Sequence, residues 1–211
     1  ICYQKRYRKK SSNIKKEVGF MEIEKGFETL DEMKRRCISS QKRGLHFIIA
    51  SVLMWGMVFG VQYLEVSVKQ KNLISFCCFA LLLPTAFVIS KFLKIDFQSK
   101  ENPLTVLGII FTVNQILYLL IAIWAFTAVP EKMLMIVAII FGGHLLPYSW
   151  LYKSKVYLTF AILIPITSLI VGMIFSVKLL TIIMIMIELI FCVFLIKENA
   201  EYFDKVSYED E

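Results

Sequence analysis

Six long apolar runs dominate the pattern of hydrophobic and polar positions along the chain. Each run contains at most one Asp, Glu, Lys or Arg, and the runs cover residues 45–64, 73–92, 104–126, 133–151, 156–177 and 179–196. A helix needs about 20 mainly apolar residues to cross the hydrocarbon core of a bilayer. The loops between the runs are short and leave no room for a separate soluble domain. The pattern therefore predicts an all-α, polytopic membrane helical bundle with six transmembrane helices.

A segment with a different pattern, residues 21–43, precedes the first run. Its apolar residues recur at helical spacing and form one stripe that includes Ile23, Phe27 and Leu30. Acidic side chains fill its first half and basic side chains its second half, an order that suits the helix dipole and places cations near anionic lipid headgroups. We expect an amphipathic interfacial helix that anchors the first span, with docking of a protein partner as the alternative.

The composition supports the membrane class and also shows where the charge lies. The chain is 57% hydrophobic, with a mean hydropathy of +0.65 and a net charge of +7. Residues 1–20 contain seven Lys or Arg and one Glu, which is +6 of that +7. Residues 15–18 can be encoded by a bacterial ribosome-binding sequence placed just before Met21. We expect Met21 to be the native start and residues 1–20 to be a disordered upstream extension; a basic cytoplasmic tail is the alternative.

The distribution of Lys and Arg outside the spans predicts the orientation. Basic side chains are more frequent on the side that holds the N-terminal segment, so both termini are expected in the cytoplasm, with residues 198–211 as a cytoplasmic tail. Tyr148, Trp150 and Tyr152 crowd one span end and are expected to be interfacial anchors. No fold for nucleic-acid recognition accompanies the basic residues, so nucleic acid is not expected as a partner.

Polar side chains at membrane depth are the candidate site: Asn114, Gln115, His144 and Glu188. A charge at the bilayer centre costs about 2.5–3.5 kcal/mol, so such groups should turn toward partners. Asn114 and Gln115 share a helix face with Tyr118, and a bundle with these faces inward would bring Glu188, His144, Gln115 and Tyr118 together. We expect either a midplane cavity that binds a small solute or a proton, or hydrogen bonds of about 0.6 kcal/mol each that only join helices.

Glycines and prolines are placed where they would shape the spans. Gly142 and Gly143 would allow two helices to approach closely, and Pro147 would kink the helix beside them. Pro84 and Pro165 occupy corresponding central positions in the second and fifth runs. They are a faint indication of a three-helix unit repeated once, which must be inverted in the membrane, as in many transporters.

Three stretches together resemble a family of uncharacterised bacterial integral membrane proteins that is defined only as a domain of unknown function. They are GLHFIIAS at 44–51, the segment from NPL at 102–104 through NQ at 114–115 to VPEKM at 129–133, and the segment from FGGH at 141–144 to YKSK at 152–155. The resemblance covers residues 44–196. It implies a bacterial cell membrane and a multi-span helical fold, and it assigns no activity and no site residues.

Three functional hypotheses remain open. The chain has no GxSxG, HExxH, Gly-rich phosphate loop or Cys/His ligand spacing, so we expect no cofactor and no metal. The favoured hypothesis is a small transporter-like or permease-like protein, with His144 and Glu188 as proton- or solute-linked groups. The alternatives are a non-catalytic regulatory, immunity or accessory membrane subunit, and an intramembrane enzyme that modifies lipids.

Overall fold

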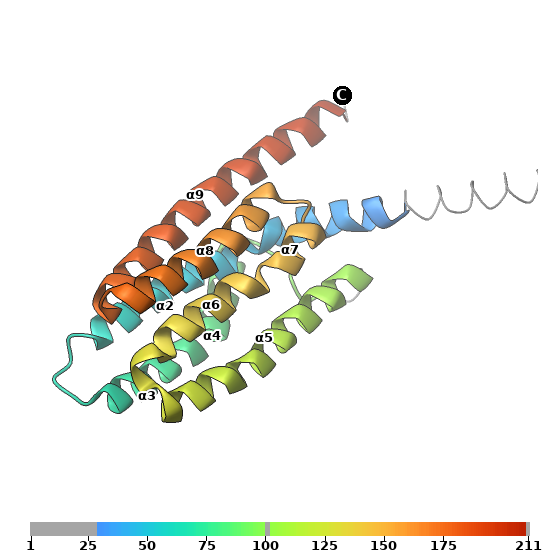
Figure 1. Ribbon diagram of the computed structural model, residues 1–211. Helices are drawn as coiled ribbons and strands as arrows, with labels where there is room; N and C mark the ends of the chain where they lie inside the picture. Colours follow the sequence, from blue (N-terminus) through green and yellow to red (C-terminus); the bar gives the residue numbers. More distant parts are fainter. Residues whose placement is uncertain (1–28, 100–101, 210–211) are drawn as a thin grey trace, which may run out of the picture.

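The protein is a bundle of long helices (Figure 1). The computed structural model describes residues 29–99 and 102–209, within which there is no strand. A helix at residues 29–41 comes first, and the elements that follow it are η1 (Lys42–Gly44), α2 (Leu45–Val61), α3 (Val68–Ala80), α4 (Leu82–Phe92), α5 (Pro103–Ala128), η2 (Pro130–Lys132), α6 (Met133–His144), α7 (Leu146–Leu151), α8 (Lys155–Ile174) and α9 (Val177–Glu209).

Six helical segments are long and apolar enough to cross a membrane: Thr29–Val61, Val68–Phe92, Pro103–Ala128, Pro130–Leu151, Lys155–Ile174 and Val177–Lys205. The predicted six-helix membrane bundle, preceded by an N-terminal helix, is therefore confirmed. The protein is a multi-pass membrane protein whose outer apolar side chains contact lipid. The proposed upstream extension, residues 1–20, and the first part of the amphipathic segment, residues 21–28, lie outside the described residues.

Two of the six spans are interrupted by proline. Proline lacks an N–H, and its ring clashes with the carbonyl four residues earlier. α3 ends at Ala80, four residues before Pro84, and α6 ends at His144, three residues before Pro147. Pro165, in contrast, lies within the uninterrupted helix α8. The second and fifth spans thus differ at the two prolines that we had matched in the sequence.

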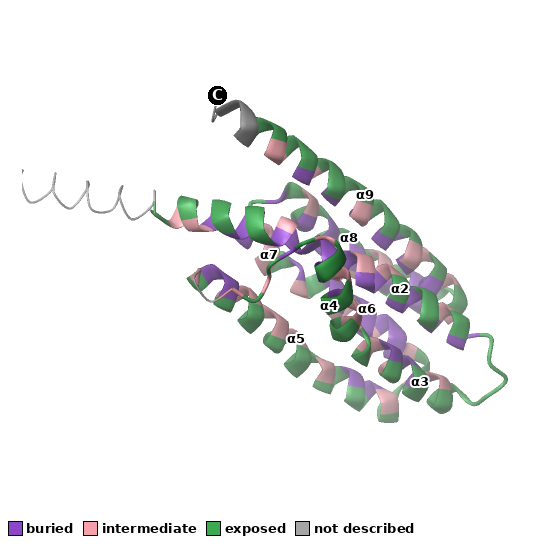
Figure 2. Cartoon of the chain, turned by 180° about the vertical axis from the view of Figure 1, so that it is seen from behind, coloured by how far each residue is buried: buried purple, intermediate pink, exposed green. Residues whose placement is uncertain are grey.

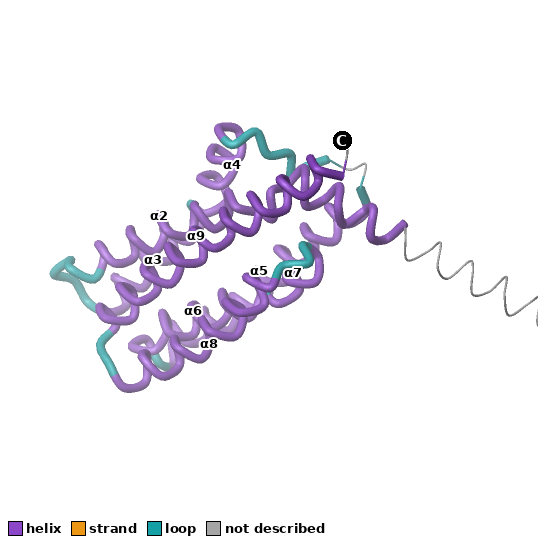
Figure 3. The backbone as a smooth tube through the Cα atoms, turned by 90° about the horizontal axis from the view of Figure 1, so that it is seen from above, coloured by secondary structure: helices purple, strands orange, loops and turns teal. Residues whose placement is uncertain are grey.

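The helices pack in two groups (Figure 3). α2 lies against α3, α4 and α9, and α6 lies against α5 and α8, while α8 and α9 join the two groups. α6 and α8 approach closely at two glycines, since a Cβ on Gly142 would lie 2.4 Å from Pro165 Cδ and a Cβ on Gly172 would lie 2.4 Å from Met135 Cγ. Small residues of this kind let membrane helices pack closely. Gly143 faces open space and has no such role.

At one end of the bundle the segment before α2 contacts α9, around Arg43. The Arg43 side chain is buried, and its Nη1 donates to Asn199 Oδ1 at 2.8 Å and its Nε to the Tyr152 carbonyl at 3.3 Å. The Glu198 carboxylate lies 3.6 Å from Nε. The backbone of Lys42, Arg43 and Gly44 is left-handed, with φ of 46°, 51° and 67°, and this interrupts the helix before α2. We call these groups the Arg43 cluster.

Gly142→Ala tests the close contact between α6 and α8. The added methyl group would overlap Pro165 and Ile164, so we expect a loss of about 1–3 kcal/mol in the free energy of unfolding. Gly143→Ala is the matched control, because its methyl group meets nothing within 4 Å and should leave stability unchanged or slightly raised. Thermal unfolding in detergent measures both. Equal melting temperatures for the two variants would contradict the packing described here.

Candidate functional site

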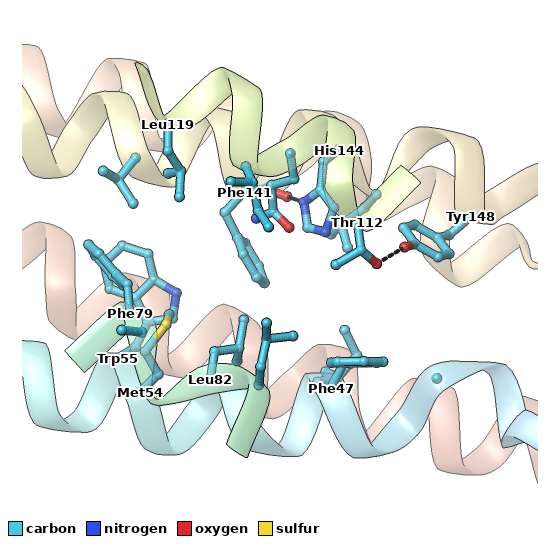
Figure 4. A pocket seen from close by; sticks show the side chains of 18 of the residues that line it. Phe47, Met54, Trp55, Phe79, Leu82, Thr112, Leu119, Phe141, His144 and Tyr148 are labelled. Carbon is cyan, nitrogen blue, oxygen red and sulfur yellow. Dashed lines mark hydrogen bonds between the residues drawn. The ribbon is translucent and has the colours of Figure 1, made fainter. Parts of the chain in front are cut away.

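A cavity of about 400 Å³ lies between α2, α3 and α4 on one side and α5, α6 and α7 on the other (Figure 4). Its size is within the range of small-molecule sites, about 300–1,000 Å³. Most of its walls are apolar or aromatic: Figure 4 shows Phe47, Trp55 and Leu82 on the wall opposite Phe141 and His144. Among the residues that the structure describes, no Asp, Glu, Lys or Arg lines it. The cavity is therefore suited to an uncharged and mainly apolar molecule.

One wall of the cavity carries a polar group made of Thr112, Gln115, His144 and Tyr148. Tyr148 Oη donates to the Gly108 carbonyl at 2.8 Å and lies 2.8 Å from Thr112 Oγ1. Thr112 Oγ1 also lies 3.2 Å from the Gly108 carbonyl, so the two hydroxyls and this carbonyl form one hydrogen-bonded group. These bonds tie α5 to α7 and satisfy both hydroxyls within the protein.

His144 is oriented by the end of its own helix. Leu145 N donates to the Gly142 carbonyl, three residues back, at 3.1 Å, and the Phe141 carbonyl contacts His144 Nδ1. A carbonyl can only accept, so Nδ1 carries the proton, and in a neutral imidazole Nε2 then holds a lone pair. Within the described chain, neither Nε2 nor the Gln115 side-chain amide has a hydrogen-bond partner. Both groups can therefore bind a ligand.

Glu188 lies away from this cavity, in the contact between α9 and α2. Its side chain is 0% exposed, Oε2 lies 2.6 Å from Ser51 Oγ, and Oε1 has no partner among the described residues. Ser51 Oγ also lies 2.8 Å from the Ile48 carbonyl. One hydroxyl proton cannot serve both contacts, and a neutral Glu188 carboxyl, which can donate to Ser51 Oγ, would satisfy both of them. An ionised carboxylate there would lack the partners that a buried charge needs.

The two remaining predicted site residues, Asn114 and Tyr118, point away from the cavity. Both are exposed on the outer side of α5, whereas Gln115, one position along the helix, faces inward. The expected meeting of Glu188, His144, Gln115 and Tyr118 therefore occurs only for His144 and Gln115. The reason is the rotation of α5, because one residue step turns a helix by 100° and separates Asn114 from Gln115.

Tyr148 and Tyr152 also differ from expectation, since both point inward rather than serving as interfacial anchors. Tyr152 Oη donates to Gln41 Oε1 at 2.7 Å, and burial raises the pKa of this phenol well above its usual range. Trp150 is exposed, with Lys34 Nζ 3.3 Å from its ring centroid. The inward position of Tyr148 could have been predicted from the sequence, because Tyr148 follows His144 by four residues and so shares its helix face.

Comparison with known proteins gives a family but no function. The model of a family described as a family of unknown function, DUF7010, matches residues 30–198. No curated protein matches the chain. No solved structure matches it either.

Infrared spectroscopy of the protein in lipid tests the protonation of Glu188. We expect the band of a protonated carboxyl group at neutral pH, because a neutral acid satisfies both Ser51 contacts and avoids a buried, uncompensated charge. Glu188→Gln should remove the band while leaving the melting temperature close to that of the wild type, since the amide is uncharged and of similar shape. An unchanged band in Glu188→Gln, or its absence in the wild type, would show that Glu188 is ionised.

Proposed function

We propose that this chain, which belongs to the DUF7010 family, is a small transporter-like protein. Its cavity would bind a mainly apolar, uncharged molecule with one hydrogen-bonding end. The observation that supports this is the pairing of apolar walls with polar groups that have no partner among the described residues, which include His144 Nε2 and the Gln115 amide. Ligand sites commonly combine an apolar lining with a few polar groups that fix orientation.

The chemistry of the walls narrows the class of solute. His144 Nε2 accepts a hydrogen bond, while the Gln115 amide can both donate and accept. A hydroxyl or a neutral acid at the end of an alkyl or aromatic body would satisfy both groups. A full charge would be excluded, because the cavity offers no opposite charge to compensate the loss of hydration.

The position of the cavity in the bundle is the reason to propose transport. It lies between two groups of helices that α8 and α9 connect, an arrangement in which one group can move against the other. His144 is the group that would contact the solute or a proton. Glu188 belongs to the contact between α2 and α9 instead, so it would act through helix packing and not by touching the solute.

We also propose a bacterial plasma membrane with both termini in the cytoplasm. The end of the bundle that carries the Arg43 cluster also carries Lys34, Lys42 and Lys153, in keeping with the excess of basic residues on the inner side. Asp31 pairs with Lys153 at 2.7 Å, so the helix at residues 29–41 contacts the bundle itself. This contact favours an anchoring role for that helix over the docking of a protein partner.

Fluorescence of Trp55, which lines the cavity, tests ligand binding. The other two tryptophans, Trp124 and Trp150, are exposed and can be replaced by Phe to leave Trp55 as the reporter. A brominated decanol should quench Trp55 saturably, because bromine would lie in the cavity beside the indole. Leu119→Phe, which fills the cavity, should abolish this quenching. Leu120→Phe, on the outer face of α5, is the matched control and should not.

The role of the polar wall is tested with a second probe, bromodecane, which has no hydroxyl. His144→Leu should weaken the binding of the alcohol about tenfold, the effect of roughly one hydrogen bond, and leave the alkane unaffected. Quenching that rises linearly with probe concentration in every variant would reflect partition into detergent alone and would contradict a binding site.

Transport itself requires a separate measurement in proteoliposomes. We expect tritium-labelled hexyl glucoside, whose uncharged sugar end crosses lipid slowly, to enter vesicles containing the wild type faster than vesicles containing Leu119→Phe. Protein-free vesicles give the background rate. Equal entry with the wild type and with Leu119→Phe, despite saturable binding of bromodecanol, would identify a binding protein that transports nothing.

A further inference from the structure

The outer face of α5 is unpartnered within the described chain. α5 packs against α6, α7 and η2 only along one side, and its opposite side is exposed along the whole helix (Figure 2). Residues there are 50–60% exposed, and they include Ile110, Leu117, Ile121 and Trp124. In a membrane helix such an apolar face can simply contact lipid, so its exposure alone identifies no partner.

Asn114 argues against contact with lipid alone, because it places an amide in the middle of that apolar face. It is the twelfth of the 26 residues of α5, is exposed, and has no hydrogen-bond partner in the part of the chain that the structure describes. Transfer of an amide from water to hydrocarbon without a hydrogen bond costs several kcal/mol. Polar groups within a span therefore usually turn toward other helices. Asn114 turns away from every helix that the structure describes.

The positions around Asn114 follow a two-stranded packing repeat. Ile110, Asn114, Leu117, Ile121 and Trp124 are separated by four, three, four and three residues, which is the heptad spacing of a coiled-coil seam. A single asparagine in such a seam sets register and oligomeric state, because its amide can donate to and accept from an identical amide. We propose that α5 forms a homodimer interface in which Asn114 of one copy hydrogen-bonds Asn114 of a second copy.

Insertion in a membrane favours a second copy of this chain as the partner of α5. Two copies inserted in the same orientation are related by a two-fold axis along the membrane normal, so their α5 helices run parallel. Asn114 then meets the same residue at the same depth, with no further adjustment of register. A different partner protein would need its own polar group at that depth and on a matching face.

The dimer would also affect the cavity, because α5 contributes Thr112, Gln115, Ile116 and Leu119 to its wall from the opposite face. Contact with a second copy would brace the span that is the least buried of the six within the described chain. The homodimer is nevertheless independent of the proposed transport function, since neither its seam nor its test involves a ligand.

The test is energy transfer between donor-labelled and acceptor-labelled copies of the full chain in liposomes, measured across protein-to-lipid ratios. We expect saturable transfer for the wild type and association about tenfold weaker for Asn114→Leu, the loss of one interhelical amide pair. Thermal unfolding checks that the variant is folded. Transfer no greater than that of an unrelated monomeric membrane protein, or equal association for the wild type and Asn114→Leu, would overturn the proposal.

Two double variants of identical composition separate the seam from a general effect of polarity. Asn114→Leu with Ile121→Asn moves the amide seven residues along the seam and should restore association. Asn114→Leu with Ile123→Asn places it two residues farther along, which is about 200° of helix rotation away from position 121 and so off the seam, at nearly the same depth, and should not. Equal association of the two double variants would overturn the assignment of this face.

Discussion

The arrangement of the bundle depends on the burial of one guanidinium group, that of Arg43. A buried charge is stable only where opposite charge and hydrogen-bond acceptors surround it. Arg43 has the Glu198 carboxylate, the Asn199 side chain and the Tyr152 carbonyl, which come from two segments far apart in the sequence. Because the fork of a guanidinium fixes direction as well as distance, this residue determines how the start of α2, the loop after α7 and the end of α9 lie relative to one another.

The Arg43 cluster also reaches the cavity. Tyr157 Oη donates to the Arg43 carbonyl at 2.7 Å and Tyr152 Oη donates to Gln41, while both rings line one end of the cavity. The same cavity is bounded on its far side by α5, which is held to the rest of the chain mainly through α6 and through Tyr148. One end of the site is thus rigidly fixed and one wall is loosely attached, a combination suited to a site that opens and closes.

The sequence predicts the number of spans far better than the direction of each side chain, and the reason is physical. Span length depends on bilayer thickness alone, so uninterrupted apolar runs reveal all six helices. In a soluble protein, apolar residues show which face of a helix points inward. In α5 nearly every residue is apolar, so the sequence does not show which face points toward the rest of the bundle. Asn114 and Tyr118 were therefore expected inside, and only Gln115 lies there. The inward position of Tyr148 could be predicted from its spacing to His144. The Arg43 cluster could not be predicted, because its partners lie 109 to 156 residues away and produce no local sequence pattern.

That separation has a consequence for biosynthesis. The partner of Arg43 on α9 follows it by 156 residues, so the ribosome must make all six spans before the guanidinium can be satisfied. Before that point Tyr157 Oη can donate to the Arg43 carbonyl and Arg43 Nε to the Tyr152 carbonyl, but the contacts of this segment with α9 are still missing. A chain that ends before Glu198 would retain all six apolar runs and the cavity's walls, yet its Arg43 guanidinium would lack the Glu198 carboxylate and the Asn199 side chain. The contact of Arg43 with α9 therefore forms only after the six apolar runs have been made, and a chain truncated before Glu198 lacks it.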